Sequence, residues 1–172
     1  MKSSLPLFLL LYAALLFSCR EAGCQTEQTT VILVRHTEKI AGTDSLSETG
    51  KLRAIELARV LKDVSFSAVY CSQYQRTFDT ALPLLTQMNL SGSFYHTSNL
   101  PGLMNEIQRS QKGKVVLIVG HSNTLWPVMK LFGLKTNQTD LPDNAYDDLF
   151  ILNVVDGQTP KLLRIQYGPR SD

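Results

Sequence analysis

The sequence lacks a strong excess of charge of either sign. It has 17 Lys and Arg residues against 15 Asp and Glu residues, which gives a net charge of +2 over 172 residues. Proteins that bind nucleic acid usually show a clear basic excess or a basic stripe, so we expect no nucleic-acid partner. The 44% of apolar residues excludes a disordered or fibrous chain and favours one globular domain.

Cysteine is also scarce. The chain has three, Cys19, Cys24 and Cys71, and none belongs to a Cys-x-x-Cys pair or a Cys/His cluster of the kind that binds zinc. Cys71 ends an apolar run, so we predict that it is a small buried residue. A disulfide between Cys24 and Cys71 in an exported protein is the alternative.

The N-terminal apolar run is too short to span a bilayer. Lys2 precedes an almost wholly apolar stretch at residues 5–17, and Ser18 follows, which is the layout of a secretory signal. Residues 16–19, Leu-Phe-Ser-Cys, resemble a bacterial lipoprotein signal, in which Cys19 would carry the lipid. We therefore predict a signal peptide at 1–18, a tether at 19–28 and one domain at 29–172, located in the bacterial envelope through a lipid anchor. Ordinary cleavage, giving a periplasmic or secreted protein, is the alternative.

Short apolar runs alternate with helical patterns through the rest of the chain. Strands are predicted at 30–34, 68–71, 93–96, 115–119, 149–155 and 161–166, and helices at 73–88, 103–111 and 123–132. A further helix is expected after the sequence Ser45-Leu46-Ser47-Glu48, which can form a capping box. This alternation predicts a three-layer α/β fold, an open, mainly parallel sheet with helices on both faces. The last two strands are close enough for an antiparallel hairpin.

Two details of the helices follow from the same pattern. Leu52, Ile55, Ala58 and Leu61 recur at helical spacing, which predicts that they form the buried face of the first helix. Pro83 falls inside the second helix, where we expect it to kink the helix or to start a new segment.

Polar residues follow the predicted strands at the edge where open α/β sheets bind ligands. Arg35 and His36 end the first strand, and His121 follows the fourth. Arg76 lies in the first turn of a helix, where a cation opposes the helix dipole; this indicates an anionic partner, or else surface pairing with Asp79 or Glu48.

The helix after His121 adds to this edge. Ser122 or Asn123 can cap it, and a helix N-terminus offers free N–H groups to an anion. Two arginines and two histidines at one sheet edge, with no cluster of acids or cysteines, indicate a pocket for a phosphate group rather than a metal.

Together these motifs resemble the signatures of the histidine phosphatase superfamily, which has the phosphoglycerate-mutase-like fold. The resemblance covers residues 29–168 and departs from the family at Thr37, where glycine is usual. The matching segments are Arg35-His36-Thr37-Glu38, Leu46-Ser47-Glu48-Thr49-Gly50, Ser72-x-x-x-Arg76-Thr77 and Gly120-His121-Ser122-Asn123.

The resemblance implies a metal-independent phosphatase that hydrolyses a small phosphomonoester or phosphoramidate. His36 would be the nucleophile and form a phosphohistidine intermediate, while Arg35, Arg76 and His121 would hold the phosphoryl oxygens. Ser122 and Asn123 would add donors to the substrate. Because this clamp takes the place of a metal, no cofactor is expected. A non-catalytic phosphate-binding module and a phosphomutase are the alternatives.

The general acid that would protonate the leaving group has no clear match. Larger relatives supply a carboxylate from the segment after the third strand, and in this chain that segment holds Glu106. Glu38 lies closer to the nucleophile in the sequence. Asp143, Asp147 and Asp148 form an acidic patch, for which solvated loop charge is the simpler interpretation.

The lipid anchor can be tested with the substitution Cys19→Ala. We expect the native chain to fractionate with membranes after globomycin-sensitive processing and the variant to become soluble, because the acyl chains would be missing. Equal membrane association of the two chains would contradict lipidation at Cys19.

Overall fold

The computed structural model describes residues 27–171. The predictions made for residues 1–26, including the signal peptide, Cys19 and Cys24, lie outside the described residues. The strands are β1 (Gln28–Arg35), β2 (Ala68–Ser72), β3 (Gly92–Tyr95), β4 (Val115–Gly120), β5 (Asp148–Val155) and β6 (Lys161–Gln166). The described helices are α2 (Glu48–Leu61), α3 (Gln75–Met88), α4 (Leu100–Ser110) and α5 (Ser122–Leu131).

One six-stranded sheet, in the order β3-β2-β4-β1-β5-β6, organises the fold. Strands β3, β2, β4 and β1 are parallel neighbours, whereas β5 pairs antiparallel with β1 and β6 antiparallel with β5. This confirms the predicted mainly parallel sheet and its terminal hairpin. The register pairs Arg35 at the end of β1 with Gly120 at the end of β4, so the residues that follow these two strands emerge side by side.

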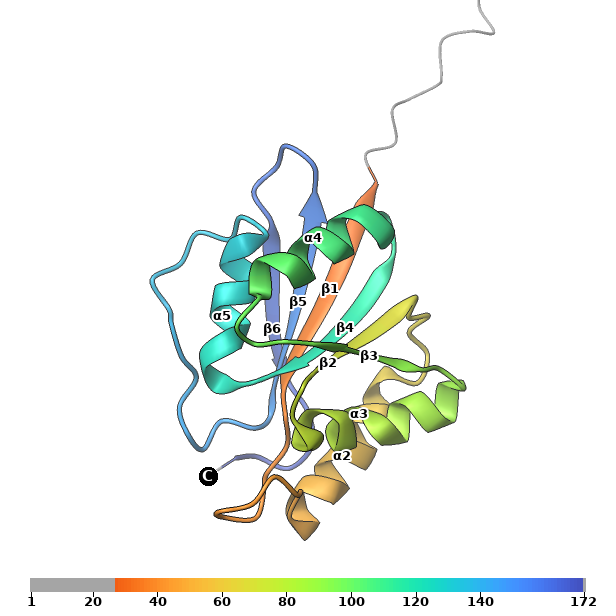
Figure 1. Cartoon of the computed structure of the whole chain (residues 1–172), viewed down its shortest axis with the longest axis vertical. Coiled ribbons are helices and arrows are strands. Elements are labelled where there is room, and N and C mark those ends of the chain that lie inside the picture. Colours follow the sequence, from red (N-terminus) through yellow and green to blue (C-terminus); the bar gives the residue numbers. More distant parts are fainter. Residues whose placement is uncertain (1–26, 172) are drawn as a thin grey trace, which may run out of the picture.

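Helices cover both faces of the sheet, as predicted (Figure 1). Helices α2 and α3 pack on one face, and α4 and α5 on the other, which gives the molecule two apolar cores. Successive residues of β4 pack alternately into the two cores. Val116 and Ile118 face α4 and α5, while Leu117 and Val119 face α2 and α3. A strand buried on both sides reads as a continuous apolar run, which is why β4 is so clear in the sequence.

The buried face of α2 matches the predicted one only in part. Ala58 and Leu61 are buried, as predicted. Leu52 and Ile55 are 67% and 58% exposed, whereas Arg53 and Leu57 are buried. Gly50 fixes this orientation because a Cβ atom there would lie 2.0 Å from the carbonyl oxygen of Glu38. The inward face carries a charged residue, Arg53, so its hydrophobic pattern is broken in the sequence.

The helix ends also differ from the predictions. Ser47, not Ser45, caps α2 by accepting the Gly50 N–H at 3.1 Å. His121 occupies the N-cap position of α5, and the Thr124 hydroxyl accepts its backbone N–H at 2.8 Å, so neither Ser122 nor Asn123 is the cap. Short polar side chains stand next to each other at both ends, and sequence alone did not identify the capping residue.

Pro83 and Cys71 are the subjects of two further predictions. Helix α3 runs through Pro83 without a break, so the predicted new segment is wrong. Cys71 is completely buried within the sheet, as predicted, and this burial raises the pKa of its thiol to about 12.

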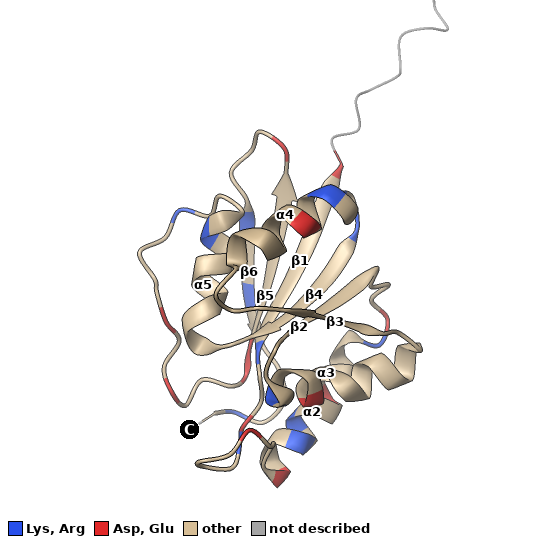
Figure 2. Ribbon diagram, viewed as in Figure 1, with Lys and Arg blue, Asp and Glu red and all other residues tan. Residues whose placement is uncertain are grey.

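None of the described helices is long and apolar enough to cross a membrane. Basic and acidic residues are interspersed over the described elements (Figure 2).

The orientation of α2 predicts opposite outcomes for two leucine truncations. Leu57→Ala should lower the free energy of unfolding by roughly 2–5 kcal/mol, because it leaves a cavity in the core. Leu52→Ala, the matched control on the same helix, should change it by less than about 0.5 kcal/mol. Chemical denaturation measures both, and a larger effect at Leu52 would contradict the orientation described here.

Candidate active site

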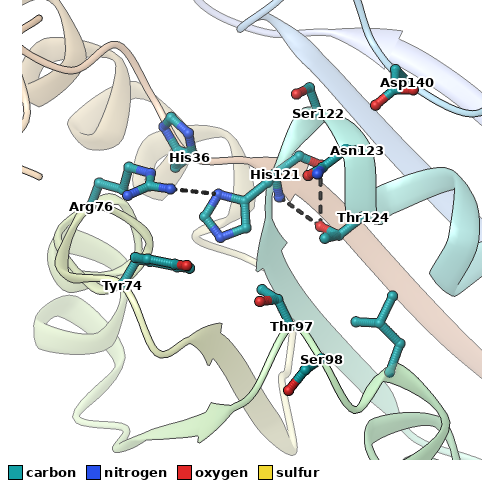
Figure 3. A pocket seen from close by; sticks show the side chains of 11 residues that line it. His36, Tyr74, Arg76, Thr97, Ser98, His121, Ser122, Asn123, Thr124 and Asp140 are labelled. Atoms are coloured by element: carbon teal, nitrogen blue, oxygen red, sulfur yellow. Dashed lines mark hydrogen bonds between the residues drawn. The ribbon is translucent and has the colours of Figure 1, made fainter. Parts of the chain in front are cut away.

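Three strand-end residues meet in one pocket. His36 follows β1, Arg76 lies in the first turn of α3 after β2, and His121 follows β4; all three line a cavity of about 670 Å³. Figure 3 shows their side chains pointing toward one another. The centres of the two imidazole rings are 5.3 Å apart. The convergence expected from the parallel strands is therefore present in the structure.

His36 is held in one tautomer by its neighbour. Its Nδ1 lies 2.8 Å from the backbone carbonyl oxygen of Thr37, and a carbonyl only accepts, so Nδ1 carries the proton. Nε2 therefore keeps its lone pair. Burial, opposed by this hydrogen bond and aided by the charge of Arg76, lowers the pKa of His36 to about 4, so the ring is neutral at pH 7.

Thr37, where the family usually has glycine, fits this arrangement. Its side chain is completely buried, and its backbone N–H donates to the Thr80 hydroxyl at 3.0 Å. The Thr80 hydroxyl in turn donates to the carbonyl of Arg76 at 2.7 Å. Thr37 thus ties the turn after β1 to α3, the helix that carries Arg76.

His121 is also neutral and held at both nitrogens. Nδ1 lies 3.3 Å from Nη2 of Arg76, and Nε2 lies 2.8 Å from the Ser72 hydroxyl. Burial, together with the nearby His36 ring and the charge of Arg76, lowers the pKa of His121 to about 3. Tyr74 packs edge-on against the ring, with ring centres 5.2 Å apart.

Arg76 pairs with a residue that the sequence analysis missed. Its Nη1 contacts the Asp44 carboxylate, not Asp79 or Glu48, and its guanidinium lies over the ring of Tyr74. The same carboxylate accepts the backbone N–H of Gln75 at the start of α3. Although burial opposes the charged form, these hydrogen bonds lower the pKa of Asp44, so it stays ionised beside Arg76. An acidic residue far from Arg76 in the sequence gives no signal of this contact.

Arg35 is buried next to the pocket rather than in its lining. Its Nη1 donates to the carbonyls of Pro142, Asp143 and Ala145 at 2.9–3.2 Å, and its guanidinium lies 4.1 Å from the ring centre of Tyr146. Arg35 thus holds the 142–146 loop beside His36. Burial lowers its pKa, with a smaller contribution in the same direction from the charge of Arg76, and Tyr146, Asp143 and Glu38 offset this only in part.

Two guanidinium N–H groups are left over at this edge of the sheet. The Nε atoms of Arg35 and Arg76 are both buried, and neither has a hydrogen-bond partner among the described residues. Buried donors of this kind are normally satisfied, and an anion bound at this edge of the sheet is a partner that would satisfy them.

Most of the remaining pocket lining is polar, with Leu100 as its apolar member. Ser122 and Asn123, both predicted to bind substrate, are part of it, together with Thr97, Ser98 and Thr124. Asp140 lies at the far end from His36 in Figure 3. The groups around the histidines therefore suit a compact anion, and those farther away suit a polar substituent.

The candidate general acids do not reach this pocket. Glu106 on α4 lines a different cavity and pairs with Arg109 at 3.1 Å. Glu38 forms a bidentate ion pair with buried Arg53, and Asp148 forms another with Arg164. Glu38 and Asp148 are thus engaged in ion pairs, while Glu106 points elsewhere.

Asp143 and Asp147 complete the acidic patch expected from the sequence. Asp143 is exposed, whereas Asp147 is buried and accepts the backbone N–H of Ser171. Neither lines the pocket of His36. Within residues 27–171, no group of three or more His, Cys, Asp or Glu side chains could hold a metal ion.

The tautomers of both histidines can be checked by ¹⁵N NMR. At pH 7 we expect the proton of His36 on Nδ1, which faces the Thr37 carbonyl. We expect the proton of His121 on Nε2, because its Nδ1 accepts a hydrogen bond from Arg76. Both rings should stay neutral on acidification to about pH 5. A proton on Nδ1 of His121 would contradict the hydrogen bond from Arg76.

The same pKa shifts predict how stability depends on pH. Both pKa values lie below the unfolded value of 6.5, so the unfolded chain binds more protons between pH 6.5 and 4. As the pH is lowered from 6.5 to 4, the free energy of unfolding should therefore fall, by up to about 1.4 kcal/mol per pH unit for each ring.

Comparisons with known proteins agree with this geometry. The model of the histidine phosphatase superfamily (branch 1) matches residues 31–97, and no curated protein matches the chain. Among solved structures, the α-ribazole phosphatase from Shigella flexneri has a TM-score of 0.59 at 16% identity, over 80% of this chain and 96% of that one.

Two further structures show the same fold. A mycobacterial glucosyl-3-phosphoglycerate phosphatase in complex with inorganic phosphate has a TM-score of 0.61 at 15% identity, covering 81% of this chain and 97% of that one. The protein histidine phosphatase SixA, complexed with tungstate, has a TM-score of 0.55 at 20% identity, covering 80% and 96%. The family model matches residues 31–97 and the solved structures share the phosphoglycerate-mutase-like fold, so the chain is similar to the histidine phosphatase superfamily in its strand-end motifs and in its fold.

Proposed function

We propose that this protein is a metal-independent phosphatase that acts through a phosphohistidine formed on Nε2 of His36. One observation carries the proposal: the Thr37 carbonyl holds the proton of His36 on Nδ1, which leaves Nε2 unprotonated in a pocket shared with a cation. A purely structural histidine has no need of a free nitrogen there. Relatives named as phosphatases have the same fold, which supports the proposal.

The reaction follows from the positions of the donors. Nε2 of His36 attacks phosphorus, the bond from phosphorus to the leaving atom breaks, and that atom keeps the electron pair and takes up a proton from water. Arg76 and the free Nε–H of Arg35 stabilise the charge on the phosphoryl oxygens. Water then hydrolyses the phosphohistidine and releases phosphate, so each turnover needs no cofactor.

The site constrains the leaving group of the substrate less than it constrains the phosphoryl group. Among the described residues, the one carboxylate that lines this pocket is Asp140, at the far end from His36 in Figure 3, and Asp44 is ionised and paired with Arg76. A site without a placed acid suits leaving groups that need little protonation, such as a phenolate or the imidazole of a phosphoramidate. We therefore propose activated phosphomonoesters and phosphoramidates as substrates. The missing acid is also what favours the alternative, a non-catalytic phosphate-binding module.

Hydrolysis of an aryl phosphate in the presence of EDTA tests this function. The native protein should turn over, because no step needs a metal, and His36→Ala should lose at least about a thousandfold of kcat, since the nucleophile is gone. Acid-labile, base-stable labelling of the native protein with ³²P would trap the intermediate.

His96→Ala is the matched control, because His96 lies outside the pocket of His36. It should keep native activity and labelling. Loss of activity in EDTA would contradict the metal-free mechanism, and activity in His36→Ala would contradict the nucleophile. Phosphate binding without turnover of any phosphoester would favour the binding module.

A further inference from the structure

The nitrogen of His121 that faces Arg76 is an acceptor. A guanidinium group only donates hydrogen bonds, so the 3.3 Å contact from Nη2 of Arg76 requires a lone pair on Nδ1 of His121. In the neutral ring the proton then sits on Nε2 and is donated to the Ser72 hydroxyl at 2.8 Å. Nδ1, rather than an N–H group, is thus directed toward Arg76 and His36.

A buried chain of hydroxyl groups fixes this direction. The Thr77 hydroxyl donates to the carbonyl of Tyr74 at 2.7 Å, so it accepts from the Ser72 hydroxyl at 3.0 Å. The Ser72 oxygen is then left to accept from Nε2 of His121. Ser72 and Thr77 are both completely buried, so water does not replace these partners. Reversing the His121 tautomer would leave its Nε2 and the Ser72 oxygen facing each other as acceptors.

The tautomer restricts what can bind. A fully deprotonated phosphoryl group placed between Arg76 and His121 presents an oxygen lone pair to the lone pair of Nδ1, and two acceptors repel each other. We propose that the site binds a phosphoryl group that carries one proton, shared between a phosphoryl oxygen and Nδ1 of His121, and that Ser72 is the positioning residue that imposes this requirement. The proposal rests on the proposed function, in which this pocket holds the phosphoryl group.

The ligand, not the protein, supplies the proton. Arg76, Arg35 and His36 act on His121 from α3 and from the end of β1, and Asp44 is the one carboxylate that opposes them among the described residues. Burial, together with these neighbours, lowers the pKa of His121 to about 3. A phosphate ester has a second pKa of about 6, so near neutral pH the proton is held more firmly by the ester than by the free ring.

The required proton restricts the site to one class of ligand. Monoanionic phosphomonoesters and phosphoramidates carry the required proton, and so does inorganic phosphate up to well above pH 8. Sulfate has the same shape and carries none. At pH 8 hydrogen phosphate and sulfate are both dianions, so their comparison isolates the effect of one proton.

Titration calorimetry with inorganic phosphate and with sulfate at pH 8 tests the proposal without any turnover. We expect phosphate to bind at least about tenfold more tightly than sulfate, the effect of one hydrogen bond to a charged group. Equal affinities, or no binding of phosphate, would overturn the proposal. If phosphate is preferred and no phosphoester is hydrolysed, the inference stands and the proposed function fails.

Two variants report on the direction of the hydrogen bond. His121→Gln places an amide that can donate, and Ser72→Ala lets Nδ1 of His121 carry the proton, so both should bring the affinity for sulfate close to that for phosphate. Ser67→Ala is the control: it removes a hydroxyl that bonds to Val115 outside the pocket, and it should keep the native preference. Native discrimination in both His121→Gln and Ser72→Ala would overturn the proposal.

The pH profile gives a second readout in the active protein. The value of kcat/KM should fall above the second pKa of each substrate, so the break for an aryl phosphate should lie at lower pH than that for an alkyl phosphate. A break at the same pH for both would assign it to a group of the protein and overturn the proposal.

Discussion

The hydrogen bond from the backbone N–H of His36 to the carbonyl of Gly120, at 2.9 Å, is the contact on which the site depends. It continues the β1–β4 ladder one residue past its end and so places the two residues that follow these strands, His36 and His121, next to each other. Gly120 allows the close approach, because a Cβ atom there would lie 2.9 Å from the Thr124 hydroxyl and 3.1 Å from that of Tyr95. Two long apolar strands thus fix the positions of two polar side chains far apart in the sequence.

Hydrogen-bond direction then fixes the chemistry of those side chains. A carbonyl that only accepts leaves Nε2 of His36 free, and an arginine that only donates makes Nδ1 of His121 an acceptor. Both rings are buried beside Arg76, so neither readily takes a second proton. In the proposed mechanism, the backbone of Thr37 and the guanidinium of Arg76 therefore determine which nitrogen attacks phosphorus and which accepts a proton.

The sequence predicted the parts that depend on periodicity and strand order. The alternating runs gave the layers and the hairpin, and the strand-end positions brought His36, Arg76 and His121 into one pocket. Contacts across loops were not predictable in this way. Asp44 reaches Arg76 from a loop with no pattern of its own, and Glu106 is turned into another cavity by the packing of α4. The face of α2 was misassigned for a related reason: the close approach of Gly50 to Glu38, which orients the helix, leaves no trace in hydropathy.

The charges around the pocket match the ligand that the hydrogen bonds require. Arg76 is offset by Asp44, both histidines are neutral, and Glu38 is paired with Arg53 away from the pocket. Arg35 is the cation without a carboxylate partner among these groups, although its Nη1 is taken up by loop carbonyls. In the proposed function, the positive charge of Arg35 is the part left uncompensated, which favours the singly protonated form of a phosphate ester over its fully deprotonated form. In a chain with a net charge of +2, the proposed phosphate site therefore depends on a few fixed donors rather than on many cations.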